Sequence, residues 1–230
     1  GENDNNGKLD LGIGRFPVKT KKEARDVVNK IKSYMSNNTL GEWRNYITFI
    51  GDDEDGNLHV KQANNLATHI TEYYPEYNVE KIFLDAYQQK VTPTGESYPD
   101  VNRIIRNRMK KGGLIFNYTG HGNETGLAHE GIISLNDINN WDNFESLPIF
   151  VTATCEFSRF DDIEIKGNDY VDRTSAGERV LLNPKGGGIA LFTTTRLVYA
   201  TPNYTLNTKF YEIVFKKNKD GKQYKLGDIM

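Results

Sequence analysis

Cys155 is the only cysteine in this chain of 230 residues, and it directly follows an apolar run at residues 147–154. His121 stands in the equivalent position after a second apolar run, residues 114–119, and has a glycine on each side. A thiol beside an imidazole is the smallest set of groups that makes a cysteine nucleophile, because the imidazole accepts the thiol proton. The two residues therefore indicate covalent catalysis if the fold brings them together.

The residues alone also allow a plainer interpretation. Free cysteine is commonly buried and inert, so Cys155 could equally be a small apolar side chain that ends a core strand. His121 would then be an ordinary loop histidine. The glycines at positions 120 and 122 favour a functional role, because glycine lets the backbone approach a substrate closely. Spacing by itself leaves both interpretations open.

Apolar runs and helical segments alternate along the chain. Thr20 and Glu23 have the spacing of a capping box, and apolar residues then recur at helical intervals as far as Met35. Strands that alternate with helices predict an α/β fold, with a mostly parallel sheet covered on both faces. The same patterns predict further helices at about residues 62–74, 99–111, 134–140, 175–182 and 203–216, and strands at residues 46–50, 79–84, 114–119, 147–154 and 189–192.

In such a sheet the carboxyl ends of the strands lie along one edge, where open α/β sheets carry their active sites. We expect Thr194 and Thr195 to contact substrate there. The backbone N–H groups of Gly122 and Cys155 would form an oxyanion hole. Residues 161–174 lack a clear period, and an active-site loop is expected there. The side chains expected to converge at the edge are Asp52, Asp53, Asp85, His121, Cys155 and those of residues 193–195.

The composition is that of a globular protein with a polar surface. Hydrophobic residues make up 37%, and 29 basic against 31 acidic residues leave a net charge of −2. The lack of a basic cluster argues against a nucleic-acid partner. No apolar run has the length of a membrane span, and no signal peptide opens the chain. We expect residues 1–14 to be a polar lead ending in a first short strand, residues 15–230 to be one catalytic domain, and the chain to be part of a longer protein.

Residues 117–125, around His121, and residues 147–155, ending at Cys155, closely resemble the gingipain family of cysteine peptidases, part of the caspase-like clan. The resemblance extends over nearly the whole chain, because residues 12–18, 91–93 and 224–228 also match. It implies a caspase-like αβα sandwich that cleaves peptide bonds through a thioester. It makes His121 the catalytic histidine and Cys155 the nucleophile.

The resemblance also implies an acidic third catalytic group at the end of an earlier strand. Asp53 aligns best with that group, Asp52 is the alternative, and Glu124 is a nearby candidate for contact with substrate. The competing interpretation of residues 52–56 is a polar turn. The family implies no required cofactor. Gingipains bind structural calcium, yet residues 53–57 lack the later bidentate glutamate of a calcium loop, so a calcium site remains only an option.

One departure from the family bears on specificity. Arginine-specific gingipains carry an acid at the base of the P1 pocket, just before the second helix. His59 takes that place here and is a candidate substrate-binding residue. An imidazole cannot offer arginine the bidentate carboxylate partner that favours it, so we do not expect cleavage after arginine.

Within the family, residues 47–53 and 57–59 most resemble the cell-surface sortases of the type IX secretion system of Bacteroidetes. That resemblance implies removal of C-terminal sorting domains from secreted proteins and transfer of the new carboxyl end to an amine on an anionic lipopolysaccharide. It also implies partners among the other outer-membrane components of that system, and a location on the outer face of the outer membrane. Two alternatives stay open: an inactive scaffold, and a receiver-like signalling module built on Asp52, Asp53 and Asp85.

Overall fold

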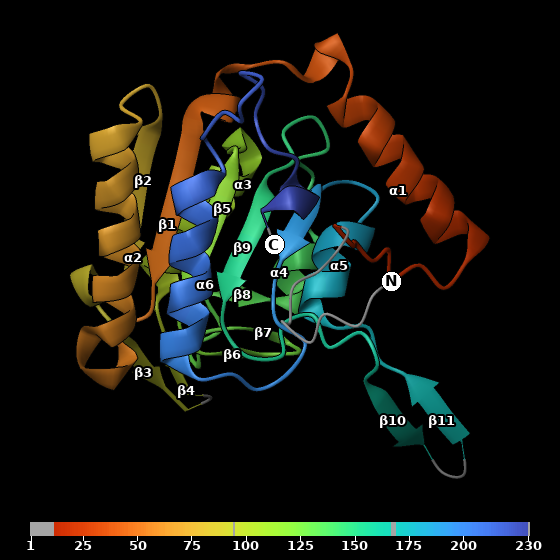
Figure 1. Ribbon diagram of the computed structural model, residues 1–230. Coiled ribbons are helices and arrows are strands. Elements are labelled where there is room, and N and C mark those ends of the chain that lie inside the picture. Colours follow the sequence, from red (N-terminus) through yellow and green to blue (C-terminus); the bar gives the residue numbers. More distant parts are fainter. Residues whose placement is uncertain (1–11, 94, 167–168, 230) are drawn as a thin grey trace, which may run out of the picture.

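The computed structural model describes residues 12–93, 95–166 and 169–229, and its centre is a five-stranded sheet (Figure 1). The strand order is β12-β9-β5-β1-β2, and every neighbouring pair is parallel. This confirms the predicted α/β fold. The five strands are β1 (Tyr46–Gly51), β2 (Asn78–Phe83), β5 (Ile115–Thr119), β9 (Ile149–Ala153) and β12 (Ala190–Phe192).

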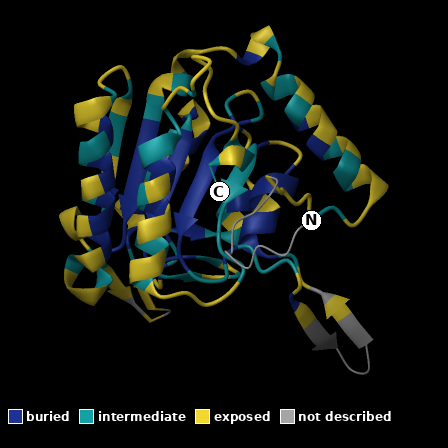
Figure 2. Cartoon of the chain, in the orientation of Figure 1, coloured by how far each residue is buried: buried dark blue, intermediate teal, exposed yellow. Residues whose placement is uncertain are grey.

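Helices cover both faces of the sheet, so its three central strands β1, β5 and β9 are buried (Figure 2). On one face, α2 (Glu54–Tyr73) and α6 (Ala200–Ile213) pack on a core that includes Ile47 and Phe49. On the other face, a core around Phe116 and Phe150 receives the remaining sheet-facing helices. These are α3 (Pro99–Lys111), α4 (Leu135–Asn139) and α5 (Ala176–Leu182). Ile115 and Phe116 point to opposite cores because successive strand residues face opposite sides.

The smaller elements lie around this sandwich. Two hairpins and one three-stranded sheet are formed by β3 (Lys90–Thr92), β4 (Gly95–Ser97), β6 (Gly122–Asn123), β7 (Gly126–Leu127), β8 (Ile133–Ser134), β10 (Ile163–Lys166) and β11 (Asp169–Asp172). Short 3₁₀ helices cover Asn37–Thr39, Glu42–Asn45, Leu84–Ala86 and Leu226–Asp228. None of the helices that the structure describes is long and apolar enough to cross a membrane.

Two expectations about local structure are wrong. Residues 161–174 hold the β10–β11 hairpin, which projects from the body in Figure 1, in place of an active-site loop. The alternation of Ile163 and Ile165 with polar residues is a strand signal. Residues 12–19 form no strand, although residues 1–14 were expected to end in a first short strand; residues 1–11 lie outside the described part of the chain. They run beside α5 and β12, where residues 13–17 line a cavity, so their backbone does not extend the sheet.

Helix α1 (Lys21–Tyr34) begins at the predicted capping box of Thr20 and Glu23 and is joined to the core by a buried lysine. Lys30 is 1% exposed, and its Nζ lies 2.7–3.3 Å from four carbonyl oxygens around the end of α5, those of Val180, Leu181, Asn183 and Gly186. Burial lowers the pKa of Lys30 to about 7. The carbonyls at a helix C-terminus attract a cation and oppose that shift.

We expect Lys30→Met to lower the free energy of unfolding by about 2 kcal/mol, because the buried carbonyls lose their donor. Unfolded lysine keeps its proton up to its ordinary pKa, whereas folded Lys30 releases it near 7. Stability conferred by Lys30 is therefore lowest at and below pH 7 and rises toward about pH 10. Urea unfolding of both proteins at pH 7 and at about pH 10 measures the loss of stability in Lys30→Met and the pH dependence that Lys30 confers. Lys32→Met, on the exposed side of α1, is the control, and an equal loss in both variants would contradict the assignment.

Candidate active site

The register of two neighbouring strands brings the predicted nucleophile and base to the same level. Strands β5 and β9 pair in parallel, and the last registered pair is Thr119 with Ala153. The Gly120 N–H continues the ladder by donating to the Ala153 carbonyl oxygen at 3.2 Å. His121 and Cys155 each stand two positions beyond that registered pair, on adjacent strands at the carboxyl edge of the sheet.

Cys155 lies at a sharp turn of the chain and is partly exposed. Glu156, the next residue, has a left-handed backbone (φ 48°), which is uncommon for a residue other than glycine. Its N–H donates to the Arg196 carbonyl oxygen at 3.2 Å. The Cys155 thiol makes a long contact of 3.6 Å with the Val198 carbonyl oxygen, and no hydrogen bond joins it to His121 within the described chain. Catalytic hydrogen bonds are often long before substrate binds, so this geometry is compatible with a nucleophile.

The backbone of His121 is held by a buried carboxylate. Asp52 is fully buried, and its Oδ2 accepts the His121 N–H at 2.8 Å. The Tyr118 hydroxyl donates to the His121 carbonyl oxygen at 2.6 Å and lies 3.3 Å from Asp52 Oδ2. Burial and the nearby Asp52 carboxylate raise the pKa of Tyr118 well above its usual value, so the phenol stays a donor. Gly120 is required between them, because a Cβ there would lie 2.3 Å from Asp52 Cβ.

Two acidic side chains at the start of α2 approach the imidazole of His121. Asp55 Oδ2 lies 3.1 Å from His121 Nε2, and Glu54 Oε2 lies 3.5 Å from the same nitrogen. Residues 55–57 are all left-handed, with φ of 53°, 63° and 63°. Asp, Gly and Asn are residues that adopt this conformation most readily, so the sequence Asp-Gly-Asn favours the turn that presents Asp55.

The carboxylate that the structure places beside the His121 ring is not the one that the sequence favours. The sequence favours Asp53, but its Oδ2 accepts a hydrogen bond from the Tyr98 hydroxyl at 2.6 Å. Burial, and then this bond, raise the pKa of Tyr98. Asp52, the alternative, holds the His121 backbone. The carboxylate nearest to the ring belongs to Asp55, because the left-handed turn swings that residue toward the sheet edge.

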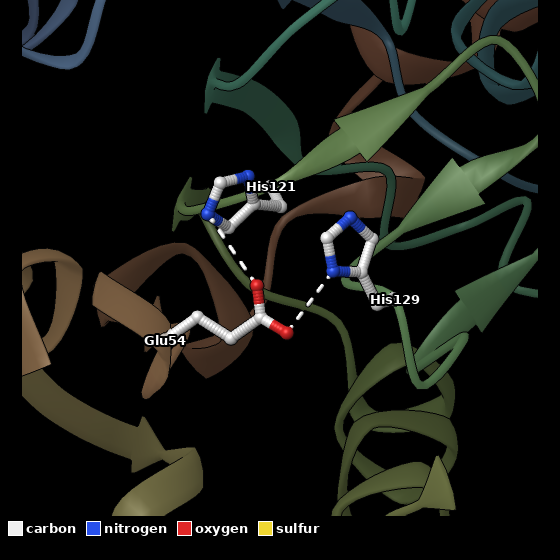
Figure 3. A group of neighbouring side chains, drawn as sticks. All are labelled: Glu54, His121 and His129. Carbon is white, nitrogen blue, oxygen red and sulfur yellow. Dashed lines mark hydrogen bonds and ion pairs between the residues drawn. The ribbon is translucent and has the colours of Figure 1, made fainter. Parts of the chain in front are cut away.

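Two further histidines flank the His121 ring. His59 is 5% exposed and packs edge-on against His121, with ring centroids 5.2 Å apart. Its Nε2 lies 3.4 Å from Asp55 Oδ2, and its Nδ1 lies 3.4 Å from Gln62 Oε1. His129 stacks on His121 with ring centroids 5.0 Å apart, and its Nδ1 lies 3.0 Å from Glu54 Oε1 (Figure 3). That hydrogen bond raises the pKa of His129.

The other predicted substrate contacts lie around the same edge. Thr194 lines a narrow cavity of about 80 Å³ between the sheet and α6. Thr195 lines a larger cavity of about 500 Å³ between residues 13–17 and α5. His59 lines neither cavity. The Glu124 carbonyl oxygen accepts the Ala176 N–H at 2.7 Å, which joins the loop after His121 to the start of α5.

Gly122, which carries one of the proposed oxyanion donors, lies against the residue before Cys155. A Cβ on Gly122 would lie 2.6 Å from Thr154 Oγ1, so the glycine leaves room for the Thr154 side chain. Within the residues that the structure describes, the Cys155 N–H has no hydrogen-bond acceptor. The donors thus remain candidates for binding a developing oxyanion.

Comparison with known proteins decides the family. The sequence model of peptidase family C25, the gingipain family of cysteine peptidases, matches residues 2–230. This chain belongs to peptidase family C25. A search of curated proteins finds no match. The fold of this C25 chain is similar to that of known structures at low sequence identity.

A crystal structure of the Arg-specific cysteine proteinase gingipain R is 21% identical, with a TM-score of 0.71; the match covers 94% of this chain and 47% of that one. A complex of the pro- and mature domains of RgpB from Porphyromonas gingivalis is 20% identical, with a TM-score of 0.68. That match covers 91% of this chain and 46% of the RgpB chain. The C25 chain thus spans less than half the length of these proteins. The similarity confirms the caspase-like fold.

Calcium does not suit residues 53–57 of this C25 domain. Calcium prefers six to eight oxygen ligands. Here the Asp53 carboxyl accepts from Tyr98, while Glu54 and Asp55 each lie against imidazole nitrogens. A calcium site elsewhere in the protein stays a prediction.

Sequence reasoning missed three contacts of His121, those with Glu54, Asp55 and His129. From the sequence, Glu54 and Asp55 were considered only as part of an incomplete calcium loop at residues 53–57. The Asp-Gly-Asn turn at residues 55–57 was the available signal. It predicts left-handed backbone and hence a change of side-chain direction immediately after the acids.

Proposed function

We propose that this chain is the catalytic part of a cysteine endopeptidase. The observation that supports it most is the register of β5 and β9, which carries His121 and Cys155 to the same level at the carboxyl edge of one sheet. Membership of family C25 points to the same chemistry. A receiver-like module is less well supported, because Asp52 and Asp53 are engaged by His121 and Tyr98.

The arrangement suggests a role for each ring nitrogen of His121. Nε2 faces Asp55 and Glu54, so its N–H can donate to a carboxylate. Nδ1 then keeps its lone pair and accepts the proton of the Cys155 thiol. The thiolate attacks the scissile carbonyl carbon, and the N–H groups of Cys155 and Gly122 stabilise the oxyanion. The protonated imidazole returns its proton to the leaving amine, which releases the first product and leaves a thioester.

Water or an amine can resolve that thioester, and the second route makes the protein a sortase. We infer from the resemblance of residues 47–53 and 57–59 that this protein acts like PorU, the sortase of the type IX secretion system. Its substrates would be secreted proteins with C-terminal sorting domains. Its acyl acceptor would be an amine on anionic lipopolysaccharide, and its location would be the outer face of the outer membrane, among other components of that system.

The surroundings of His59 support a preference other than arginine at P1. This imidazole is buried against His121 and Asp55, in the place where arginine-specific gingipains are expected to carry an acid. Asp55 is already within reach of two imidazoles. We therefore do not expect this position to offer the guanidinium of a P1 arginine a bidentate carboxylate partner.

A substrate-like affinity label tests the proposal on the full-length protein. We expect a peptidyl acyloxymethyl ketone to form one adduct, on Cys155. His121→Asn should slow its formation by about 10²-fold or more, because the thiol loses its proton acceptor. Intact-protein and peptide mass spectrometry measure both. His69→Asn, which removes an imidazole from the far part of α2, is the control; equal labelling of all three proteins would sink the mechanism.

The same full-length protein separates a sortase from a simple hydrolase. A cargo protein with its C-terminal sorting domain is incubated with and without a soluble primary amine. For a sortase, the mass of the new carboxyl end shifts by addition of the amine. Cleavage that yields only a free carboxylate would support the peptidase function and contradict the sortase function.

A further inference from the structure

We propose that Glu54, His121 and His129 form a binding site for a divalent transition ion of the Zn²⁺ type, and that the bound ion switches the peptidase off. Figure 3 shows the three side chains turned toward one another from three places in the chain: the start of α2, the loop after β5 and the loop after β7. One ligand atom from each residue lies within 4.8 Å of the other two. The inhibitory effect rests on the proposed function, whereas the binding site does not.

Each of the two imidazoles approaches one oxygen of the Glu54 carboxylate. Glu54 Oε2 lies 3.5 Å from His121 Nε2, and Glu54 Oε1 lies 3.0 Å from His129 Nδ1. Ligands of a tetrahedral zinc at about 2.0–2.2 Å from the ion lie about 3.4 Å from one another. The carboxylate is thus placed between two imidazoles at separations that an ion can bridge with small rotations of the side chains.

The chemistry of the ligands selects the class of ion. Two imidazole nitrogens and one carboxylate oxygen suit zinc and its neighbours, whereas calcium and magnesium prefer oxygen alone. Asp55 Oδ2, 3.1 Å from the same His121 nitrogen, is the nearest protein group for a fourth position. Otherwise water completes the site, as it does in three-ligand zinc sites.

A second set of three residues, Asp55, His59 and His121, also lies within ligand distance. Both sets use His121 Nε2, which has one lone pair, so they are alternatives for the same ion. The Glu54 set is the more accessible. The His129, Glu54 and His121 side chains are 64%, 35% and 33% exposed, against 7% for His59. Asp55 is 56% exposed, so the near-complete burial of His59 is what makes the second set the less accessible one.

Binding of the ion would reverse the tautomer that catalysis needs. In the free protein, Nε2 carries the proton toward Asp55 and Glu54, and Nδ1 has the lone pair for the thiol. A metal bond takes the Nε2 lone pair, so the proton of the neutral ring must move to Nδ1. Nδ1 then has no lone pair with which to accept the proton of Cys155. The ion would also draw Glu54 and Asp55 away from their support of the imidazole.

The site is tested first without the thiol, because cysteine itself binds zinc. Titration of the full-length Cys155→Ala protein with Zn²⁺ in a calorimeter is expected to show one equivalent bound, and Co²⁺ is expected to give a visible absorption band. Adding His129→Gln should raise the Kd for Zn²⁺ at least about 10-fold. His69→Gln, the control for loss of an imidazole, should leave the Kd within about twofold.

Inhibition is measured next, with Cys155 present. The Zn²⁺ concentration that halves cargo processing should rise in His129→Gln by the same factor as the Kd, each variant being compared with its own metal-free rate. Zinc binding that disappears in Cys155→Ala but is unchanged in His129→Gln would overturn the site. If zinc binds as expected but the metal-free protein never cleaves cargo, the proposed function fails and the metal site stands.

Discussion

Replacing Cys155 by alanine is expected to lower cargo processing by the full-length protein by about 10³- to 10⁶-fold, the range seen when a covalent nucleophile is removed. No thioester can form without the sulfur. Only transition-state binding by the oxyanion donors would remain. The rate of appearance of the cleaved cargo, measured by quantitative mass spectrometry, gives this ratio.

The same substitution should leave the fold intact. The Cys155 side chain is partly exposed, and within the described part of the chain its thiol has one hydrogen-bonding contact, at 3.6 Å, with the Val198 carbonyl oxygen. The free energy of unfolding should therefore change by less than about 0.5 kcal/mol. Cys155→Ser, which keeps the volume but replaces the sulfur, should lose activity to a similar extent. Retention of a tenth of the wild-type rate by either variant would exclude Cys155 as the nucleophile.

The second large effect is expected at Asp52. We expect Asp52→Ala to lower the free energy of unfolding by about 2–5 kcal/mol, since two backbone donors lose their acceptor at about 1–3 kcal/mol each. These donors are the His121 N–H and the Glu54 N–H. Chemical unfolding measures the loss. Asp85→Asn, at the exposed acid that follows β2, is the matched control and should change stability by less than about 0.5 kcal/mol.

Asp52→Asn separates charge from shape. Asparagine fills the same space, but its amide must face either the Glu54 N–H or the His121 N–H with a donor of its own. We expect a smaller loss of about 2 kcal/mol and a shift of the His121 backbone. The rate constant for cargo cleavage should fall about 10-fold at a temperature where both proteins are folded. A stable, fully active Asp52→Asn protein would show that the carboxylate does not position His121.

Much of the site could be predicted without coordinates because it depends on strand order and on strand ends. The alternation of apolar runs and helical periods specifies a parallel sheet, and a parallel sheet places its carboxyl ends together. That rule predicts that His121, Cys155 and an acid after β1 share one edge, and the resemblance to the gingipain family then implies the roles of His121 and Cys155. The hairpin at β10 and β11 was missed because its strand signal is short and lies in a polar segment.

The identity of the acid beside the imidazole could not be predicted in this way. Asp52, Asp53, Glu54 and Asp55 are consecutive in sequence, yet their carboxylates make four different sets of contacts. Side-chain direction over these four residues depends on where β1 ends and where the left-handed turn at residues 55–57 begins. If β1 ended, or the left-handed turn began, one residue earlier or later, all four carboxylates would point in other directions.

The amino-acid sequence by itself determined the fold class, the family and the two residues proposed for the covalent step, because these depend on periodicity and on short motifs at strand ends. Only the tertiary structure decided which acid faces His121, that His59 is buried beside it and that His129 stacks on it. Those contacts join residues 54–59, 121 and 129, which lie on separate elements. These contacts form when loops from separate elements pack over the edge of the sheet, and no local sequence pattern predicts that packing.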